Sequence, residues 1–223
     1  MKRKTLIFLT LILATIFLCA CSDAMEKRKE NVSELREDVL VYADEKVKVS
    51  IFSGTRENPY EVNGQVGKEK TLYTVINVDG SFADSDDVKY TLYLGDKSYD
   101  GFLTKHPFKE SYSTELPVKT LSKATLTITS GQNSNTYELK SVKTDKTISA
   151  SDALQLAEKR LKKSIKKMEK GDKLNCEIYV RLIENPISSE GGYYWYVAYV
   201  PEKYTVYALL IHSVSGEIVA VRE

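Results

Sequence analysis

SASDALQLAEKRLKKSIKKMEKG, residues Ser149–Gly171, is the stretch with the clearest helical pattern in the chain. Ser149 and Asp152 have the spacing of a capping box, in which the serine oxygen accepts from a backbone N–H and the acid reaches back. Apolar residues then recur at three- and four-residue steps, which predicts one buried face. These residues are Leu154, Ala157, Leu161, Ile165 and Met168. Lysines near the end complement the negative pole of the helix dipole, and Gly171 predicts the stop.

Before residue 146 the apolar residues recur with a period of two, which indicates strands rather than helix. Val47–Ile51 and Leu72–Val78 alternate in this way, and Gly131–Asn135 has the composition of a hairpin loop. About seven short strands with turn residues between them are typical of a β-sandwich. We therefore expect an all-β, Ig-like sandwich over residues 39–145. The resemblance to Ig-like modules is architectural, because the Cys…Trp…Cys pattern of true immunoglobulin domains is absent.

After the helix, four more segments have strand patterns. They are Leu174–Leu182, Tyr193–Val200, Tyr204–Ile211 and Glu217–Arg222. A helix followed by such strands predicts one helix packed on a small antiparallel sheet. We expect this α+β domain over residues 146–223, so that the fold class of the whole chain is α+β.

This second region resembles the PepSY domain. The resemblance lies in the helix opening Ile148–Ala157, in the aromatic strand Tyr194–Tyr199 and in the final hairpin Val206–Val221. The hairpin turn of the family usually reads Asp-x-x-Thr-Gly-Glu, whereas residues 212–217 read HSVSGE, with the Asp and the Thr replaced. The resemblance covers about a third of the chain. It implies a non-catalytic module, of a kind found in peptidase propeptides and exported bacterial proteins and proposed to bind or restrain peptidases.

The first 20 residues have the composition of a signal peptide. Three basic residues, Lys2, Arg3 and Lys4, precede the apolar run Leu6–Leu18. This run of about 13 residues is short for a membrane-spanning helix, which needs about 20. A positive start, a short apolar stretch and small residues at the end are typical of export signals.

Leu18–Cys21 (LCAC) resembles the bacterial lipobox. Cys19 is unsuited as the acceptor, because bulky Leu18 would then occupy a place that needs a small side chain. The resemblance implies cleavage before Cys21, acylation (palmitate) of Cys21 and a lipoprotein of the cell envelope. The protein would be held on the extracytoplasmic face of the cell membrane, since more than one acyl chain gives stable anchoring. An uncleaved anchor or an ordinary secretory signal remains the alternative.

Residues 21–38 are dense in charges of both signs, and we interpret them as a solvated tether. A docking segment for a neighbouring protein is the alternative. Acylation of Cys21 would leave Cys176 without a disulfide partner after cleavage. Because Cys176 lies at strand spacing among apolar residues, we expect it to be a small buried hydrophobe.

Charge and composition narrow the function. Removal of the leader lowers the number of basic residues from 32 to 29, against 31 acidic ones. The mature chain would therefore have a net charge of about −2, with no overall basic field for nucleic acid. The chain has only two histidines, His106 and His212, and no metal-binding motif. We expect no metal, no cofactor and no catalytic residues.

The most suggestive residues for binding are aromatic, and they lie on the expected C-terminal sheet. They are Tyr194, Trp195, Tyr196, Tyr199 and Tyr207. One helix covers only one face of a sheet, so the other face would expose several rings unless the β-domain packs on it. Tyrosine and tryptophan are favoured at interfaces. We therefore predict a partner-binding face here, with core packing and interdomain contact as the alternative.

The sequence thus favours a non-catalytic, membrane-anchored lipoprotein that binds or regulates another envelope protein, such as a peptidase, through its PepSY-like domain. A structural or accessory lipoprotein is the second hypothesis, and a hydrolase with an unrecognised site is the third. A large exposed aromatic patch would favour binding, whereas a deep cleft with converging acids would favour the enzyme.

Overall fold

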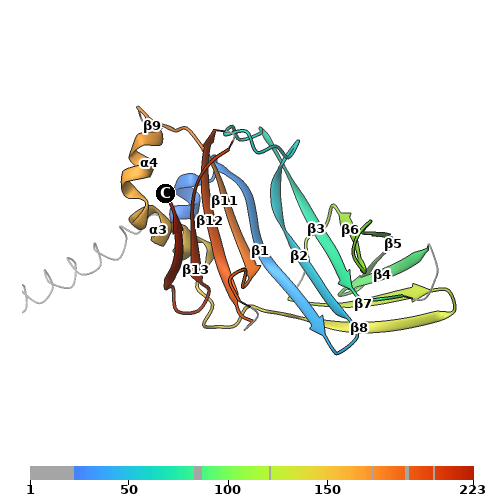
Figure 1. Ribbon diagram of the computed structural model, residues 1–223. Helices are drawn as coiled ribbons and strands as arrows, with labels where there is room; N and C mark the ends of the chain where they lie inside the picture. Colours follow the sequence, from blue (N-terminus) through green and yellow to red (C-terminus); the bar gives the residue numbers. More distant parts are fainter. Residues whose placement is uncertain (1–22, 83–86, 121, 172, 189–190, 203) are drawn as a thin grey trace, which may run out of the picture.

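The computed structural model describes residues 23–82, 87–120, 122–171, 173–188, 191–202 and 204–223 (Figure 1). The expected signal peptide and the expected lipid acceptor Cys21 lie outside these residues.

The described chain consists mostly of strands, with three short helices. The helices are α2 (Ala24–Arg28), α3 (Ala150–Arg160) and α4 (Lys162–Met168). The strands before α3 are β1 (Val32–Ala43), β2 (Lys48–Asn58), β3 (Glu69–Asp79), β4 (Val88–Leu94), β5 (Lys97–Lys105), β6 (Ser111–Leu116), β7 (Lys123–Ser130) and β8 (Asn133–Ser141). Those after α4 are β9 (Glu169–Lys170), β10 (Lys173–Leu174), β11 (Glu177–Glu184), β12 (Tyr193–Glu202), β13 (Thr205–His212) and β14 (Ile218–Arg222).

The capping box predicted for the central helix is confirmed. The Ser149 hydroxyl oxygen accepts from the Asp152 N–H at 3.0 Å, and the Ser149 N–H donates to the Asp152 carboxylate at 3.0 Å. The single expected helix is in fact two, because Leu161 departs from helical geometry (φ −92°, ψ 17°) between α3 and α4. The buried face predicted for the helix is present on both pieces.

Strands β1 to β8 form a closed antiparallel barrel, so the expected Ig-like sandwich is wrong. The strand order runs β1-β2-β3-β6-β5-β4-β7-β8, and β8 returns to β1. Leu40 pairs with Ser141 and Val41 with Lys140 where the barrel closes. A sandwich keeps two sheets with open edges, whereas this closure joins the first strand to the last. The barrel has its own core around Leu40, Ile51, Ile76, Leu92 and Leu126.

The expected separate PepSY-like domain is also wrong, because the C-terminal strands continue the sheet of the barrel. β1 is long enough to serve both regions: its first half pairs in parallel with β11, from Val32 to Arg36, and its second half pairs with β8. A register shift between Arg36 and Asp38, in the pairing with β2, marks the change of partner. The result is one sheet of twelve strands that ends at β14.

The charged segment expected to be a tether is ordered structure from Asp23 onward. It begins with α2, whose Ala24 is buried, and continues into the first part of β1. The Arg28 Nε donates to the Glu158 carboxylate of α3 at 2.5 Å. The density of charge indicated a solvated tether, but several of these charged side chains form ion pairs with residues far away in the sequence.

Helices α2, α3 and α4 gather at one end of the molecule and the barrel lies at the other (Figure 1). The second core lies under the helices, where Leu154 and Leu161 pack with Ile178 and Trp195 of the sheet. None of the described helices combines the length and the apolar character that crossing a membrane requires.

Candidate functional site: a polar groove beside α2

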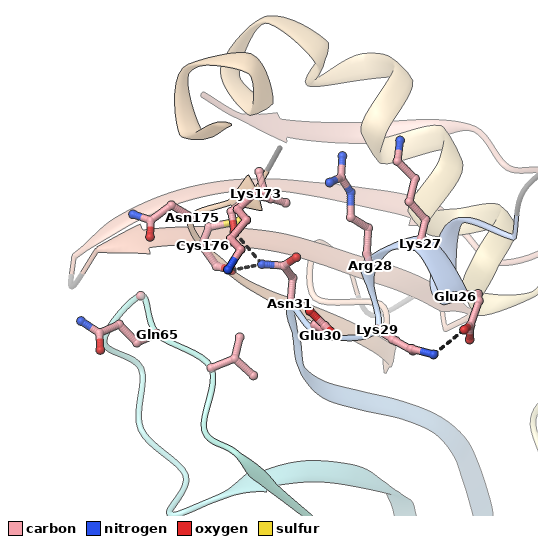
Figure 2. Close-up of a pocket in the computed structure, with 13 residues that line it drawn as sticks. Glu26, Lys27, Arg28, Lys29, Glu30, Asn31, Gln65, Lys173, Asn175 and Cys176 are labelled. Atoms are coloured by element: carbon pink, nitrogen blue, oxygen red, sulfur yellow. Dashed lines mark hydrogen bonds and ion pairs between the residues drawn. The ribbon is translucent and has the colours of Figure 1, made fainter. Parts of the chain in front are cut away.

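A groove of about 570 Å³ opens between three segments that are far apart in the sequence. Its walls are residues 26–31 from α2 and the turn after it, residues 64–66 from the β2–β3 loop, and residues 173–176 before β11. Figure 2 shows these segments and the side chains that line the groove. Most of the side chains are polar or charged, which is the lining expected of a site for a polar ligand.

The first wall is held against α3. The Asp23 carboxylate caps α2 by accepting from the Met25 N–H at 2.9 Å, and it also accepts a hydrogen bond from the Ser151 hydroxyl. Arg28 adds its ion pair with Glu158, in which both side chains are largely buried. The short helix is therefore fixed at both ends, although its five residues would not be a stable helix alone.

The floor of the groove is tied together by Asn31. Its side-chain amide donates to the carbonyl of Leu174 at 2.8 Å and to that of Cys176 at 3.0 Å. The Asn31 carbonyl accepts in turn from the Ile178 N–H at 2.7 Å. One asparagine therefore connects the start of β1 to the start of β11 (Figure 2).

The loop wall is held by a buried carboxylate. One oxygen of Glu177, which is fully buried, accepts from the backbone N–H groups of Asn63, Gly64 and Gln65 at 3.2, 2.9 and 2.9 Å. Its other oxygen accepts from the Tyr179 hydroxyl. Successive N–H groups around one anion form a nest, and charge-assisted bonds of this kind are strong. The loop is thus locked onto β11.

Gly64 is required by the close approach of this loop to the sheet. Its φ is +91°, and a Cβ at this position would lie 2.4 Å from the Pro201 carbonyl oxygen. Both the positive φ and the contact with backbone exclude other residues without a shift of the loop.

A second buried charge fixes the base of the same loop. Glu34 of β1 accepts from Arg181 of β11, with the Nη2 atom at 2.6 Å and the Nε atom at 2.9 Å. The Tyr73 hydroxyl donates to its other oxygen at 2.5 Å, and the Tyr60 hydroxyl of the loop donates to Oε2 at 3.0 Å. Burial favours the neutral form of Glu34, but the charge of Arg181 and the hydrogen bonds from Tyr73 and Arg181 outweigh burial and lower the pKa of Glu34.

Two side-chain amides on the groove walls remain available to a ligand, whereas the charged groups there are partly paired. Lys29 is paired with Glu26 at 2.5 Å. Within the described ranges, however, the side-chain amides of Gln65 and Asn175 form no hydrogen bond. Figure 2 shows them at the same end of the groove, one on the loop wall and one on the strand wall. Each amide can donate to a carbonyl and accept from an N–H.

Cys176 lines the groove but is not a nucleophile there. Its side chain is 3% exposed, and burial raises the pKa of its thiol to about 12. Because the thiolate is the reactive form, the thiol is inert near neutral pH. The prediction that Cys176 is a small buried hydrophobe is confirmed.

The five aromatic residues predicted to bind a partner do not form one surface. Trp195 and Tyr199 are 1% and 0% exposed, respectively, and pack in the core under the helices, where the Trp195 indole N–H donates to the Ile148 carbonyl at 3.0 Å. Tyr207 packs against the same core, whereas Tyr196 packs against a small cluster that includes Tyr179. Tyr194 stacks edge-on against His212. Trp195 and Tyr199 therefore cannot contact a partner, because both side chains are buried in the core, as the core-packing alternative expected.

His212 is used in the turn between β13 and β14. Its Nδ1 accepts from the Ser215 N–H at 3.1 Å and lies 3.1 Å from the Ser215 hydroxyl. Across the described ranges, no three His, Cys, Asp or Glu side chains gather where they could hold a metal ion.

The groove was not predicted from the sequence, for reasons that lie in its residues. Asn31 falls in the segment interpreted as a tether, and Glu177 falls on the strand face opposite the apolar residues Cys176 and Ile178. Asn63-Gly64 was visible as a turn dipeptide. Nothing in the sequence, however, indicates that the turn encloses a carboxylate more than a hundred residues away.

Comparisons of the chain with protein-family models, with curated proteins and with solved structures give no match.

Proposed function

We propose that this chain is an exported, lipid-anchored protein without catalytic activity, which binds an extended segment of another envelope protein in the groove beside α2. The observation that carries the proposal is the pair of unpaired amides, Gln65 and Asn175, on two walls that are themselves fixed. Preorganised walls favour binding, because little order has to be created when the ligand arrives.

An extended peptide fits this lining better than an apolar ligand. A peptide backbone offers alternating N–H and C=O groups, which match the donor and acceptor of each side-chain amide. The charged groups at the rim, Lys27, Glu30 and Lys173, add selectivity for polar side chains of the segment.

The anchoring part of the proposal rests on the lipobox-like sequence that ends at Cys21. Cys21 precedes Asp23 by two residues, and Asp23 is bound to the start of α3. Two residues of extended chain span about 7 Å. An acylated Cys21 would therefore keep the groove close to the membrane, where a juxtamembrane segment of a partner is within reach.

The groove is tested by crosslinking in membranes. A photo-crosslinking amino acid at position 66, which also lines the groove, should capture a discrete partner, and adding Gln65→Ala/Asn175→Ala to that chain should lose most of the captured material. The matched control is Gln132→Ala/Asn133→Ala, which removes the same two residue types from the exposed β7–β8 turn. Equal recovery from both double variants would exclude the groove as the binding site.

The anchor is tested separately with Cys21→Ser. This variant should lose incorporation of labelled palmitate and should be unprocessed or shed from the membrane. Continued lipid labelling of Cys21→Ser would contradict the anchoring part of the proposal. It would not bear on binding in the groove.

A further inference from the structure

Eight basic side chains are concentrated in the short segment around α4. Between Lys159 and Lys173 the sequence has eight basic and two acidic residues. The basic residues are Lys159, Arg160, Lys162, Lys163, Lys166, Lys167, Lys170 and Lys173. All eight are exposed. Since residues 21–223 have 29 basic and 31 acidic residues, the rest of that chain has eight more acidic than basic residues. The segment from Lys159 to Lys173 therefore has a net charge of about +6, whereas the rest of residues 21–223 has a net charge of about −8.

The lysines of α4 form one face of the helix. Lys162 and Lys166 are four residues apart, as are Lys163 and Lys167, so the four side chains lie together. The opposite face, with Ile165 and Met168, is buried against the sheet. Ion pairs do not neutralise this face, since these four lysines have no acidic partner among the described residues.

We propose that this lysine face of α4 docks on the phosphate headgroups of an anionic lipid bilayer. The inference rests on the proposed lipid anchor, which it deepens by assigning an orientation to the anchored protein. A lipid bilayer is favoured by charge complementarity and by where the described chain begins. Asp23 is bound to Ser151 at the start of α3, and the eleven residues of α3 separate that point from α4 by about 16 Å. The anchor and the lysine face can therefore reach one plane.

The two contacts would act together. Acyl chains hold the protein at the bilayer, and clustered lysines near an anionic surface add attraction that falls off within about a Debye length. The acidic remainder of the chain would be repelled from the same surface. The helical end would thus face the membrane and the barrel would face away from it (Figure 1).

The test uses a chain that starts at Ser22, which includes every described residue but has no acyl group. Its partition is measured by sedimentation with vesicles of phosphatidylcholine alone and of phosphatidylcholine with 30% phosphatidylglycerol. We expect at least about tenfold stronger binding to the anionic vesicles, lost when the salt concentration is raised to about 1 M.

The variant Lys162→Gln/Lys163→Gln/Lys166→Gln/Lys167→Gln should reduce binding to the anionic vesicles by at least about tenfold. Glutamine has a similar helix propensity, so α4 should persist, which circular dichroism and thermal melting check. The matched control neutralises four exposed lysines on the barrel, Lys97, Lys109, Lys123 and Lys140, and should retain binding within about twofold.

Equal binding to both kinds of vesicle, or an equal loss in both quadruple variants, would overturn the proposal. Binding of the protein to a soluble polyanion such as polyphosphate, without binding to anionic vesicles, would also overturn the proposal, since this would indicate a polymer ligand. Because the test needs no acylation, its failure is distinguishable from failure of the anchor, which the labelling of Cys21→Ser reports.

Discussion

Arg181 of β11 and Glu34 of β1 form an ion pair that joins the C-terminal strands to the barrel. The Glu34 side chain is 7% exposed and that of Arg181 24%. The guanidinium contacts one carboxylate oxygen through both Nε and Nη2, while Tyr73 donates to the other oxygen. The pair lies where β1 runs parallel to β11, next to the shift in register that redirects β1 toward β8. It therefore helps to hold the two regions in one sheet.

Breaking this pair should destabilise the protein strongly. Arg181→Met leaves Glu34 buried without its cation, and we expect a loss of about 3 kcal/mol in the free energy of unfolding, at the low end for a buried pair because Arg181 is partly exposed. Urea unfolding measures the change. The control is Arg222→Met on the exposed strand β14, which should change stability by less than about 0.5 kcal/mol. Similar effects of the two substitutions would show that the pair contributes little.

The same carboxylate should make stability depend on pH in the acid range. The folded pKa of Glu34 is lowered, so its ionised form stabilises the fold above the unfolded pKa of about 4.3. This contribution is lost as the pH falls from about 4.3 through the folded pKa. The difference in unfolding free energy between wild type and Glu34→Gln should therefore be largest near pH 7 and should shrink below about pH 4.

Urea titrations at pH 7, 4 and 3 check this expectation. Glu184→Gln is the control, because Glu184 is an exposed carboxylate that pairs with Lys48 at 2.6 Å. It should show little difference from wild type at any of these pH values. A difference for Glu34→Gln that stays constant from pH 7 to pH 3 would contradict the role assigned to the ionised form.

Glu34 also shows why the local elements were predictable and their assembly was not. Capping and periodicity are local, so Ser149 with Asp152 and the apolar steps after them predicted the helix. The partner of Glu34 is 147 residues away, and without Arg181 in view the charges of residues 32–38 indicate a solvated segment. The closing pairs of Leu40 and Val41 with β8 are likewise about a hundred residues apart. Period-two patterns identify strands but not their neighbours, and the neighbours separate a barrel from a sandwich.

The groove depends on the shape of its loop, which a pair of glycine substitutions tests. Gly64 and Gly131 both have positive φ, but a Cβ meets the Pro201 carbonyl oxygen at 2.4 Å in the first case and no atom within 4 Å in the second. Gly131→Ala should cost about 1 kcal/mol from backbone strain alone. Gly64→Ala should cost at least about 2 kcal/mol more, because the loop must move away from Glu177, and it should reduce crosslinking from position 66. Equal costs for the two substitutions would indicate that the loop is free to shift.

Cys176 provides a probe of the groove floor that needs no ligand. In a chain that starts at Ser22 it is the only cysteine. Burial raises the pKa of its thiol to about 12, so the native protein should react very slowly with a disulfide reagent at pH 8 and rapidly once it is unfolded in guanidinium chloride. A chain with Cys176→Ala and Ser134→Cys, which moves the thiol to the exposed β7–β8 hairpin, should react rapidly without denaturant. If native Cys176 reacted as fast as that control, the floor would be open to solvent, and the walls tied by Asn31 would not be preorganised for a partner.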